Sequence, residues 1–120
     1  MIKEMQDYIS SIYENMTYGQ IQDSPDNLYN INMYNSNSKP FFSDDNTHTL
    51  TINLFIRDTS FETMQANNEN VSNSLCNIYD KDISNYHIVN TKMTSSNEPS
   101  RDDKNRYSIT STFEMLIEEV

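Results

Sequence analysis

The chain has 120 residues, enough for one two-layer core and too few for two, so we expect a single domain spanning residues 1–120. Its 8 basic and 18 acidic residues give a net charge of −10, which disfavours binding to the outside of nucleic acid because that affinity depends on Lys and Arg. A lone cysteine excludes an internal disulfide, and no apolar run approaches the ~20 residues of a membrane helix. The N-terminal residues carry charges throughout and lack the apolar stretch of a signal peptide, so we expect a soluble protein made inside the cell.

The N-terminal half begins with a predicted helix, because apolar residues recur at spacings of three and four between Ile2 and Met16. Gly19 is suited to end this helix. The turn-forming segment DSPDN, residues 23–27, precedes LYNINMY, residues 28–34, which alternates apolar and polar side chains as a half-buried strand does. The polar residues 35–46 are too rich in turn formers for regular structure and are predicted as a loop.

The clearest pattern of the sequence follows this loop. Strict alternation over residues 50–57 predicts a second strand. The helix that follows begins at a cap among residues 58–60 and presents an apolar face that Asn68 interrupts. A third strand is predicted over residues 86–94, and after a charged loop at 95–106 a terminal strand runs from Tyr107 to Ile117.

The order helix-strand-strand-helix-strand-strand predicts an α+β fold. We expect an antiparallel or mixed sheet of about four strands with the helices packed on one face. Such an open sheet has two edges with unpaired backbone groups, which must be protected or used. Copies that pair head to tail form a closed ring when the rotation between them closes.

Catalytic and metal-binding patterns are missing from the sequence. His48 and His87 lie in or near predicted strands with no second His or Cys at ligand spacing, which is typical of surface or half-buried histidines. Cys76 adjoins the apolar stripe of the second helix and has no basic neighbour to activate its thiol, so we expect it to pack in the core. Turn formation explains the acidic pairs, which are Asp23 and Asp26, Asp44 and Asp45, and Asp102 and Asp103. A chain with one glycine cannot build a glycine-rich phosphate loop. We therefore expect no enzyme, no cofactor and no metal site.

Two adjacent aromatic residues follow a proline in the first polar loop, at Pro40, Phe41 and Phe42. Neighbouring side chains on an extended backbone point in opposite directions, so both phenyl rings cannot enter one core. Either one of them meets another chain, or the loop folds back over its own sheet.

Three stretches carry a resemblance to a known family. They are DSPDN before a short strand, TLTINLFIRDTSFETM (49–64) joining a strand to a helix, and RDDKNRYSITSTFEM (101–115) leading into the last strand. In this order and spacing, over nearly the whole chain, they resemble the small minor capsid proteins of tailed phages of Gram-positive hosts. Those proteins are similar to the tail terminator, or tail-to-head joining, group of siphophage-like phages.

Single positions match the pattern of that family. Arg57 closes the central strand, Phe61 lies a few residues into the helix, and Arg106 with Tyr107 ends the charged turn. The family often has Gly where this chain has Asn105, which can also adopt the left-handed conformation.

The resemblance implies a virion structural protein of the tail or neck, assembled in the host cell cytoplasm. Its ring, typically a homo-hexamer, caps the tail tube, stops tube polymerisation and joins the tail to the head connector. The implied partners are further copies of the chain, the tail tube protein and the connector or neck protein, with no membrane, while DNA passes through the lumen without specific binding. The expected interface residues are Pro40, Phe41, Phe42, Arg57, Arg101 and Arg106. An acidic balance suits a lumen through which DNA slides, and the expected lumen-facing residues are Asp44, Asp45, Asp102 and Asp103.

Two alternatives remain open. A head completion or neck connector protein would come from the same virion, although the helix-first α+β order favours the terminator over a β-barrel adaptor. A small ligand-binding or enzymatic module would need titratable groups clustered in a cavity, and the sequence offers only scattered ones.

Overall fold

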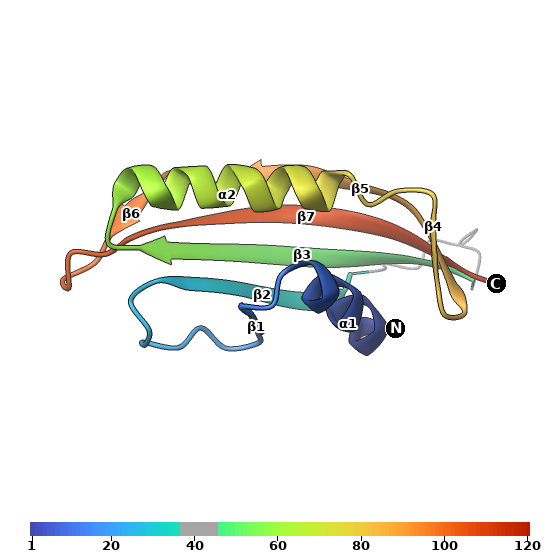
Figure 1. Ribbon diagram of the computed structural model, residues 1–120. Coiled ribbons are helices and arrows are strands. Elements are labelled where there is room, and N and C mark those ends of the chain that lie inside the picture. The colour runs from blue at the N-terminus through green and yellow to red at the C-terminus, as the bar shows by residue number, and fades with distance from the viewer. Residues whose placement is uncertain (37–45) are drawn as a thin grey trace.

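The computed structural model describes residues 1–36 and 46–120. Within these ranges the chain forms two helices and a seven-stranded sheet (Figure 1). The elements are α1 (Ile2–Ile12), β1 (Met16–Tyr18), β2 (Leu28–Asn35), β3 (Thr47–Asp58), α2 (Phe61–Cys76), β4 (Lys81–Ile83), β5 (Tyr86–Ser96), β6 (Ser100–Arg101) and β7 (Tyr107–Glu119). The α+β class predicted from the sequence is confirmed.

The strands lie in the order β1-β2-β3-β7-β5-β4, with β6 paired to β7. The two longest strands are central: β3 and β7 pair antiparallel from Thr47 opposite Glu118 to Asp58 opposite Tyr107. β1 runs parallel to β2, whereas the other neighbouring strands are antiparallel. The sheet is therefore mixed, and among the described strands the single parallel pair lies at one edge.

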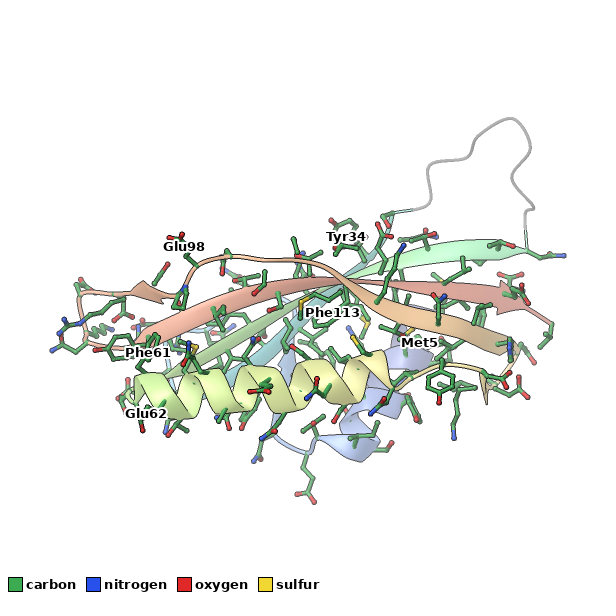
Figure 2. The ribbon with its side chains drawn as sticks, turned by 90° about the horizontal axis from the view of Figure 1, so that it is seen from above. Met5, Tyr34, Phe61, Glu62, Glu98 and Phe113 are labelled. Carbon is green, nitrogen blue, oxygen red and sulfur yellow. The ribbon has the colours of Figure 1, made fainter. Side chains whose placement is uncertain are left out.

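Both helices pack on one face of the sheet, as Figure 2 shows from above. α2 lies across β3, β5 and β7, while α1 contacts both β1 and β4, the strands at the two edges. One helix can reach both edges only because the sheet curls toward the helices. The core between the layers is apolar, and its fully buried side chains include Met5, Ile9, Ile31, Leu50, Ile52, Leu54, Ile56, Met64, Leu75, Ile88, Phe113 and Met115.

α2 begins where the sequence predicts, with Ser60 as its N-cap. The Ser60 hydroxyl accepts a hydrogen bond from the backbone N–H of Thr63 (3.3 Å), which satisfies one donor of the first turn. Asn68, which interrupts the apolar stripe, accepts a bond from the buried Ser111 hydroxyl (3.1 Å). Ser111 in turn lies 3.1 Å from the Ser96 hydroxyl, so a small polar network replaces apolar packing under the first half of the helix.

The number of strands and the end of the first helix differ from the sequence prediction. The expected order holds for the long elements, but β1, β4 and β6 raise the count from about four strands to seven. Strands of two or three residues are too short to show a period of two, so their sequence carries no signal. Met16 is buried in β1 rather than on α1, which ends at Ile12, and Gly19 (φ 87°) turns the chain after β1 instead of ending the helix.

The expected packing of Cys76 is also wrong, because its side chain is exposed. Successive residues of a helix are rotated by about 100°. The neighbour of the buried Leu75 therefore points toward solvent.

Candidate functional site

Arg57 holds the loop before β2 at one end of the sheet. Its guanidinium is buried and donates from Nη2 to the carbonyl oxygens of Gln22 (2.8 Å) and Pro25 (2.6 Å), and from Nε to that of Asp26 (3.2 Å). Burial lowers the pKa of Arg57, and the nearby charge of Arg106 acts in the same direction. All three contacts go to backbone carbonyls, so Arg57 fixes the path of residues 22–26.

A second buried arginine joins the same loop to the turn before β7. Arg106 donates from Nη2 to the carboxylate of Asp23 (2.9 Å) and from Nε to that of Asp102 (2.7 Å). Lys104 also binds Asp23. Hydrogen bonds from Lys104 and then Arg106 lower the pKa of Asp23 to about 2, so its carboxylate stays ionised over the physiological range. The bond to Asp23 is also the main reason why the pKa of Arg106 is raised.

The turn at residues 102–106 closes on the carboxylate of Asp102. Its Oδ1 accepts from the backbone N–H groups of Lys104 (2.9 Å) and Arg106 (2.9 Å). The bond from the Arg106 N–H is the largest cause of the lowered pKa of Asp102. Asn105 adopts φ 60°, the left-handed conformation expected for it.

The predicted site residues fall into three groups. Arg57 and Arg106 meet inside the loop cluster, with Asp102 beside them, and all three bind within the chain. Arg101 and Asp103 are exposed, and the guanidinium of Arg101 lies 5.8 Å from the ring centre of Tyr107. Their roles at an interface or a lumen stay predictions.

The remaining predicted site residues, Pro40, Phe41, Phe42, Asp44 and Asp45, lie outside the described residues. Sequence reasoning also missed the partners of the two arginines. Asp23 is 83 positions from Arg106, and Gln22 is 35 positions from Arg57. Only the charged segments themselves could have suggested a pairing, because no local pattern links positions so far apart.

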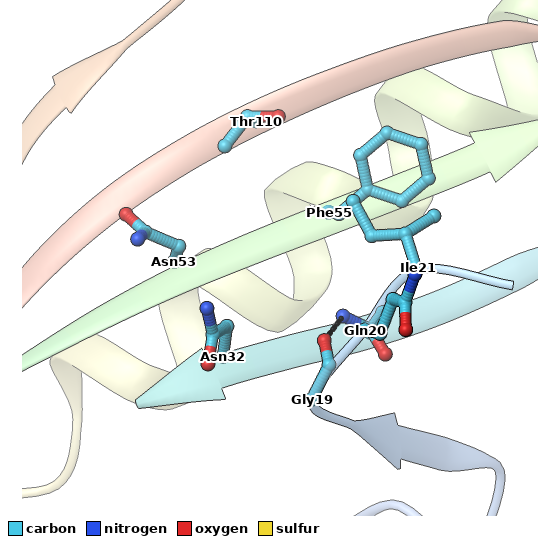
Figure 3. A pocket seen from close by; sticks show the side chains of 8 residues that line it. Gly19, Gln20, Ile21, Asn32, Asn53, Phe55 and Thr110 are labelled. Atoms are coloured by element: carbon cyan, nitrogen blue, oxygen red, sulfur yellow. Dashed lines mark hydrogen bonds between the residues drawn. The ribbon is translucent and has the colours of Figure 1, made fainter. Parts of the chain in front are cut away.

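A hollow of about 400 Å³ opens on the face of the sheet that the helices leave uncovered (Figure 3). Asn32 on β2 and Asn53 on β3 are direct register partners there. The eight lining residues, none of them charged, are Gly19, Gln20, Ile21, Asn30, Asn32, Asn53, Phe55 and Thr110. Their sequence signal is a row of amides and hydroxyls at the outward positions of strands, and on its own this pattern indicates only the polar side of a half-buried sheet.

One wall of the hollow is built by the chain as it leaves β1. Gly19 donates its backbone N–H to the Ile31 carbonyl (3.0 Å), and its own carbonyl accepts from the Asn30 amide (3.0 Å; dashed line in Figure 3). Asn30 is buried, and its Oδ1 accepts from the hydroxyl of Thr17 (2.8 Å). This anchoring carries Ile21 over the sheet to a place beside Phe55, where 46% of the isoleucine is exposed.

Both histidines lie at the opposite end of the sheet and are half-buried strand residues, as predicted. The His87 ring binds Asp82 through Nδ1 (2.7 Å) and lies 3.3 Å from Asp80 through Nε2. The bond to Asp82 raises the pKa of His87. His48 binds Glu119 (2.9 Å).

The last candidate features of residues 1–36 and 46–120 are a metal site and a membrane-spanning helix. No group of three or more His, Cys, Asp or Glu side chains in those ranges is placed to hold a metal ion. None of the helices there is long and apolar enough to cross a membrane.

Comparison with known proteins gives a likeness in fold alone. No family model and no curated protein matches the sequence. A chain in the structure described as the virion of a native gene transfer agent particle superposes with a TM-score of 0.66 and 13% sequence identity. The match covers 98% of this chain and 90% of that chain, so the two share nearly their whole architecture.

Proposed function

We propose that this chain is a structural protein of a virion, and more specifically a tail terminator whose copies form a ring on the end of a tail tube. The observation that carries the proposal is the fold shared with a chain of a gene transfer agent virion over 98% of this chain. That likeness supports the virion role. The resemblance of residues 23–27, 49–64 and 101–115 to the tail terminator group supports the finer role.

In this role the ring stops polymerisation of the tube and offers a docking surface to the head connector, within a virion assembled in the host cytoplasm. Sheet and helices set the angle between neighbouring subunits, while loops make the contacts. The loop at 40–45 and the exposed Arg101 and Asp103 supply contact and lumen residues. A net charge of −10 suits a lumen that DNA passes without binding. The proposal assigns the protein no catalytic activity and no cofactor.

The arginine cluster has a supporting place in this proposal. Arg57 and Arg106 fix the loops at one end of the sheet through bonds inside the chain. A docking loop that is already ordered loses less conformational entropy when it binds. The two arginines therefore present the turn at 101–106 rather than touch a neighbour themselves.

The test is the native mass of the purified protein at near-physiological salt with magnesium, combined with negative-stain images, alone and with tail tube protein. We expect a ring of about six subunits with a central hole. A stable closed dimer would contradict the proposal. Binding to the portal or adaptor but not to the tube would instead favour a head completion protein.

A double variant, Phe41→Ser with Phe42→Ser, tests the first loop in the same assay. We expect ring formation to be lost while circular dichroism of the monomer is unchanged, since both positions lie in a polar loop of the sequence. The matched control is Tyr79→Ser, which removes an aromatic side chain that is 61% exposed elsewhere on the molecule. Rings that persist in the double variant would remove this loop from the interface.

A further inference from the structure

The floor of the hollow on the open face offers amide groups that the described part of the chain leaves wholly or partly unpaired. Asn32 is exposed, and its side chain makes no hydrogen bond within residues 1–36 and 46–120. Asn53 accepts from the Thr112 hydroxyl through Oδ1 (2.9 Å), which leaves its N–H₂ group available. A carboxamide carries the same donor and acceptor as a peptide unit, so it can pair with a passing polypeptide backbone.

The wall of the hollow suits an apolar side chain. Ile21 is held over the sheet by the Gly19 anchor and remains largely exposed next to the half-buried Phe55 (Figure 3). An apolar side chain placed between them would remove apolar surface from water on both sides of the contact, which favours association.

The absence of charge in the lining argues against a nucleic acid ligand and in favour of a second copy. Phosphate binding requires Lys or Arg, and none of the lining residues is charged. Each copy carries a net charge of −10, so two copies repel wherever their acidic surfaces meet. A contact between copies is therefore favoured where the surface is neutral, as it is here.

We infer that this hollow is the docking site for residues 37–43 of a second copy of the chain, with Phe41 or Phe42 against Ile21 and Phe55. The segment SNSKPFFS, residues 36–43, carries two adjacent phenylalanines and no acidic residue. The inference rests on the proposed ring. The hollow and residues 37–43 are two different surfaces of one chain, and a head-to-tail ring is built from contacts between two different surfaces.

Chain length disfavours the same contact within one copy. Thr47 begins β3 and lies eight positions before Phe55 on that strand, a distance of about 27 Å at 3.4 Å per residue. Only five positions separate Phe42 from Thr47, and these span at most about 18 Å when fully extended. The Phe42 backbone of one copy therefore stops short of the level of its own Phe55, whereas a second copy has no such limit.

A pair of matched variants tests the docking site in the full-length protein. Asn32→Trp fills the hollow with a bulky neutral side chain, and Asn73→Trp makes the same change at an exposed position of α2. We expect Asn32→Trp to raise the concentration needed for half assembly by roughly tenfold or more, because the indole would occupy the space that the docked segment needs. We expect Asn73→Trp to change it less than about twofold. Sedimentation velocity measures both.

Equal behaviour of the two variants, in a wild-type protein that forms rings, would overturn the docking site and leave the ring standing. A wild-type protein that forms no ring, alone or on tail tube protein, would refute the proposed function and the docking together. The two failures are therefore distinguishable from one data set.

Disulfide trapping identifies the occupant directly. In a Cys76→Ser background, Asn32→Cys combined with Phe42→Cys should give cross-links between copies under mild oxidation, read as a ladder by denaturing mass analysis. The matched control combines Asn73→Cys with Phe42→Cys and should give none. A disulfide within one copy, or no disulfide in assembled rings, would overturn the assignment.

Discussion

Phe113 and Thr112 are neighbours on β7, yet they meet different surroundings. Phe113 is fully buried between the sheet and the helices, whereas the Thr112 hydroxyl donates to Asn53 on the uncovered face. The difference extends along the strands: alternate residues of β3, from Leu50 to Ile56, are fully buried on the helix side. Their partners on the other side are Thr51, Asn53, Phe55 and Arg57.

The two faces of the sheet contribute differently: the covered face stabilises the fold, and the open face is available for binding. The covered face removes apolar area from water, which is the dominant favourable contribution to folding. The open face relies on single polar contacts, whose net contribution is about 1 kcal/mol each when neutral. Residues there can change with little effect on the fold, so this is the face on which a binding surface can vary.

The largest effect is expected from Phe113→Ala. Removing a fully buried phenyl ring loses its transfer free energy and leaves a cavity, so the free energy of unfolding should fall by about 3–5 kcal/mol. The adjacent control, Thr112→Ala, loses one hydrogen bond on the open face and should cost about 1 kcal/mol or less. Urea unfolding followed by circular dichroism measures both. Similar losses for the two variants would contradict the division between the faces.

Arg57→Met tests an exception on the open face, because Arg57 is a buried charge there. It donates to three carbonyl oxygens of residues 22–26, and a charged hydrogen bond contributes about 1.5–3 kcal/mol. Since the bonds form a unit and the released carbonyls regain water, we expect a total loss of about 2–3 kcal/mol.

The readouts separate loop release from general destabilisation. Hydrogen exchange should rise first in the loop at 22–26, before the central strands respond. Arg57→Lys keeps the charge without the planar fork, so its free energy of unfolding should lie between those of the wild type and Arg57→Met. A Met variant with unchanged stability and unchanged exchange would show that the loop is held by other contacts.

The long elements were predictable because their residues carry local periodicity. β3 alternates without interruption, and the cap at Ser60 stands directly before an apolar face of α2. Asn68 looked like a defect of that face, since its partner Ser111 lies 43 positions away. A helix-period pattern cannot show such a partner, so its role was visible only in three dimensions.

The candidate sites were predictable only in part. The resemblance to the tail terminator group singles out Arg57 and Arg106, but their function inside the chain depends on residues 22–26, which no spacing connects to them. The hollow depends on Ile21 crossing the open face after Gly19. That path is set by tertiary hydrogen bonds of Gly19 to β2 rather than by the local sequence.

The smallest effect is expected from the pH dependence of the stability that His87 contributes through its carboxylate neighbours at the end of the sheet. Asp82, Asp80 and Glu118 face its ring and raise its pKa above the ordinary value of 6.5, with the hydrogen bond to Asp82 as the largest cause. The protonated ring is therefore favoured in the folded state over the unfolded state. Its stabilisation is fully present below pH 6.5 and is lost as the pH rises through the folded-state pKa.

Comparing wild type with His87→Gln isolates this contribution. The difference in Tm between them should be largest near pH 6 and should shrink toward pH 9, since the neutral imidazole lacks the attraction to the carboxylates. Asp82→Asn removes the largest cause of the shift, so an NMR titration of the ring in that variant should give a pKa closer to 6.5 than in wild type. A pH-independent difference in Tm would show that His87 stabilises the fold by packing and not by its charge.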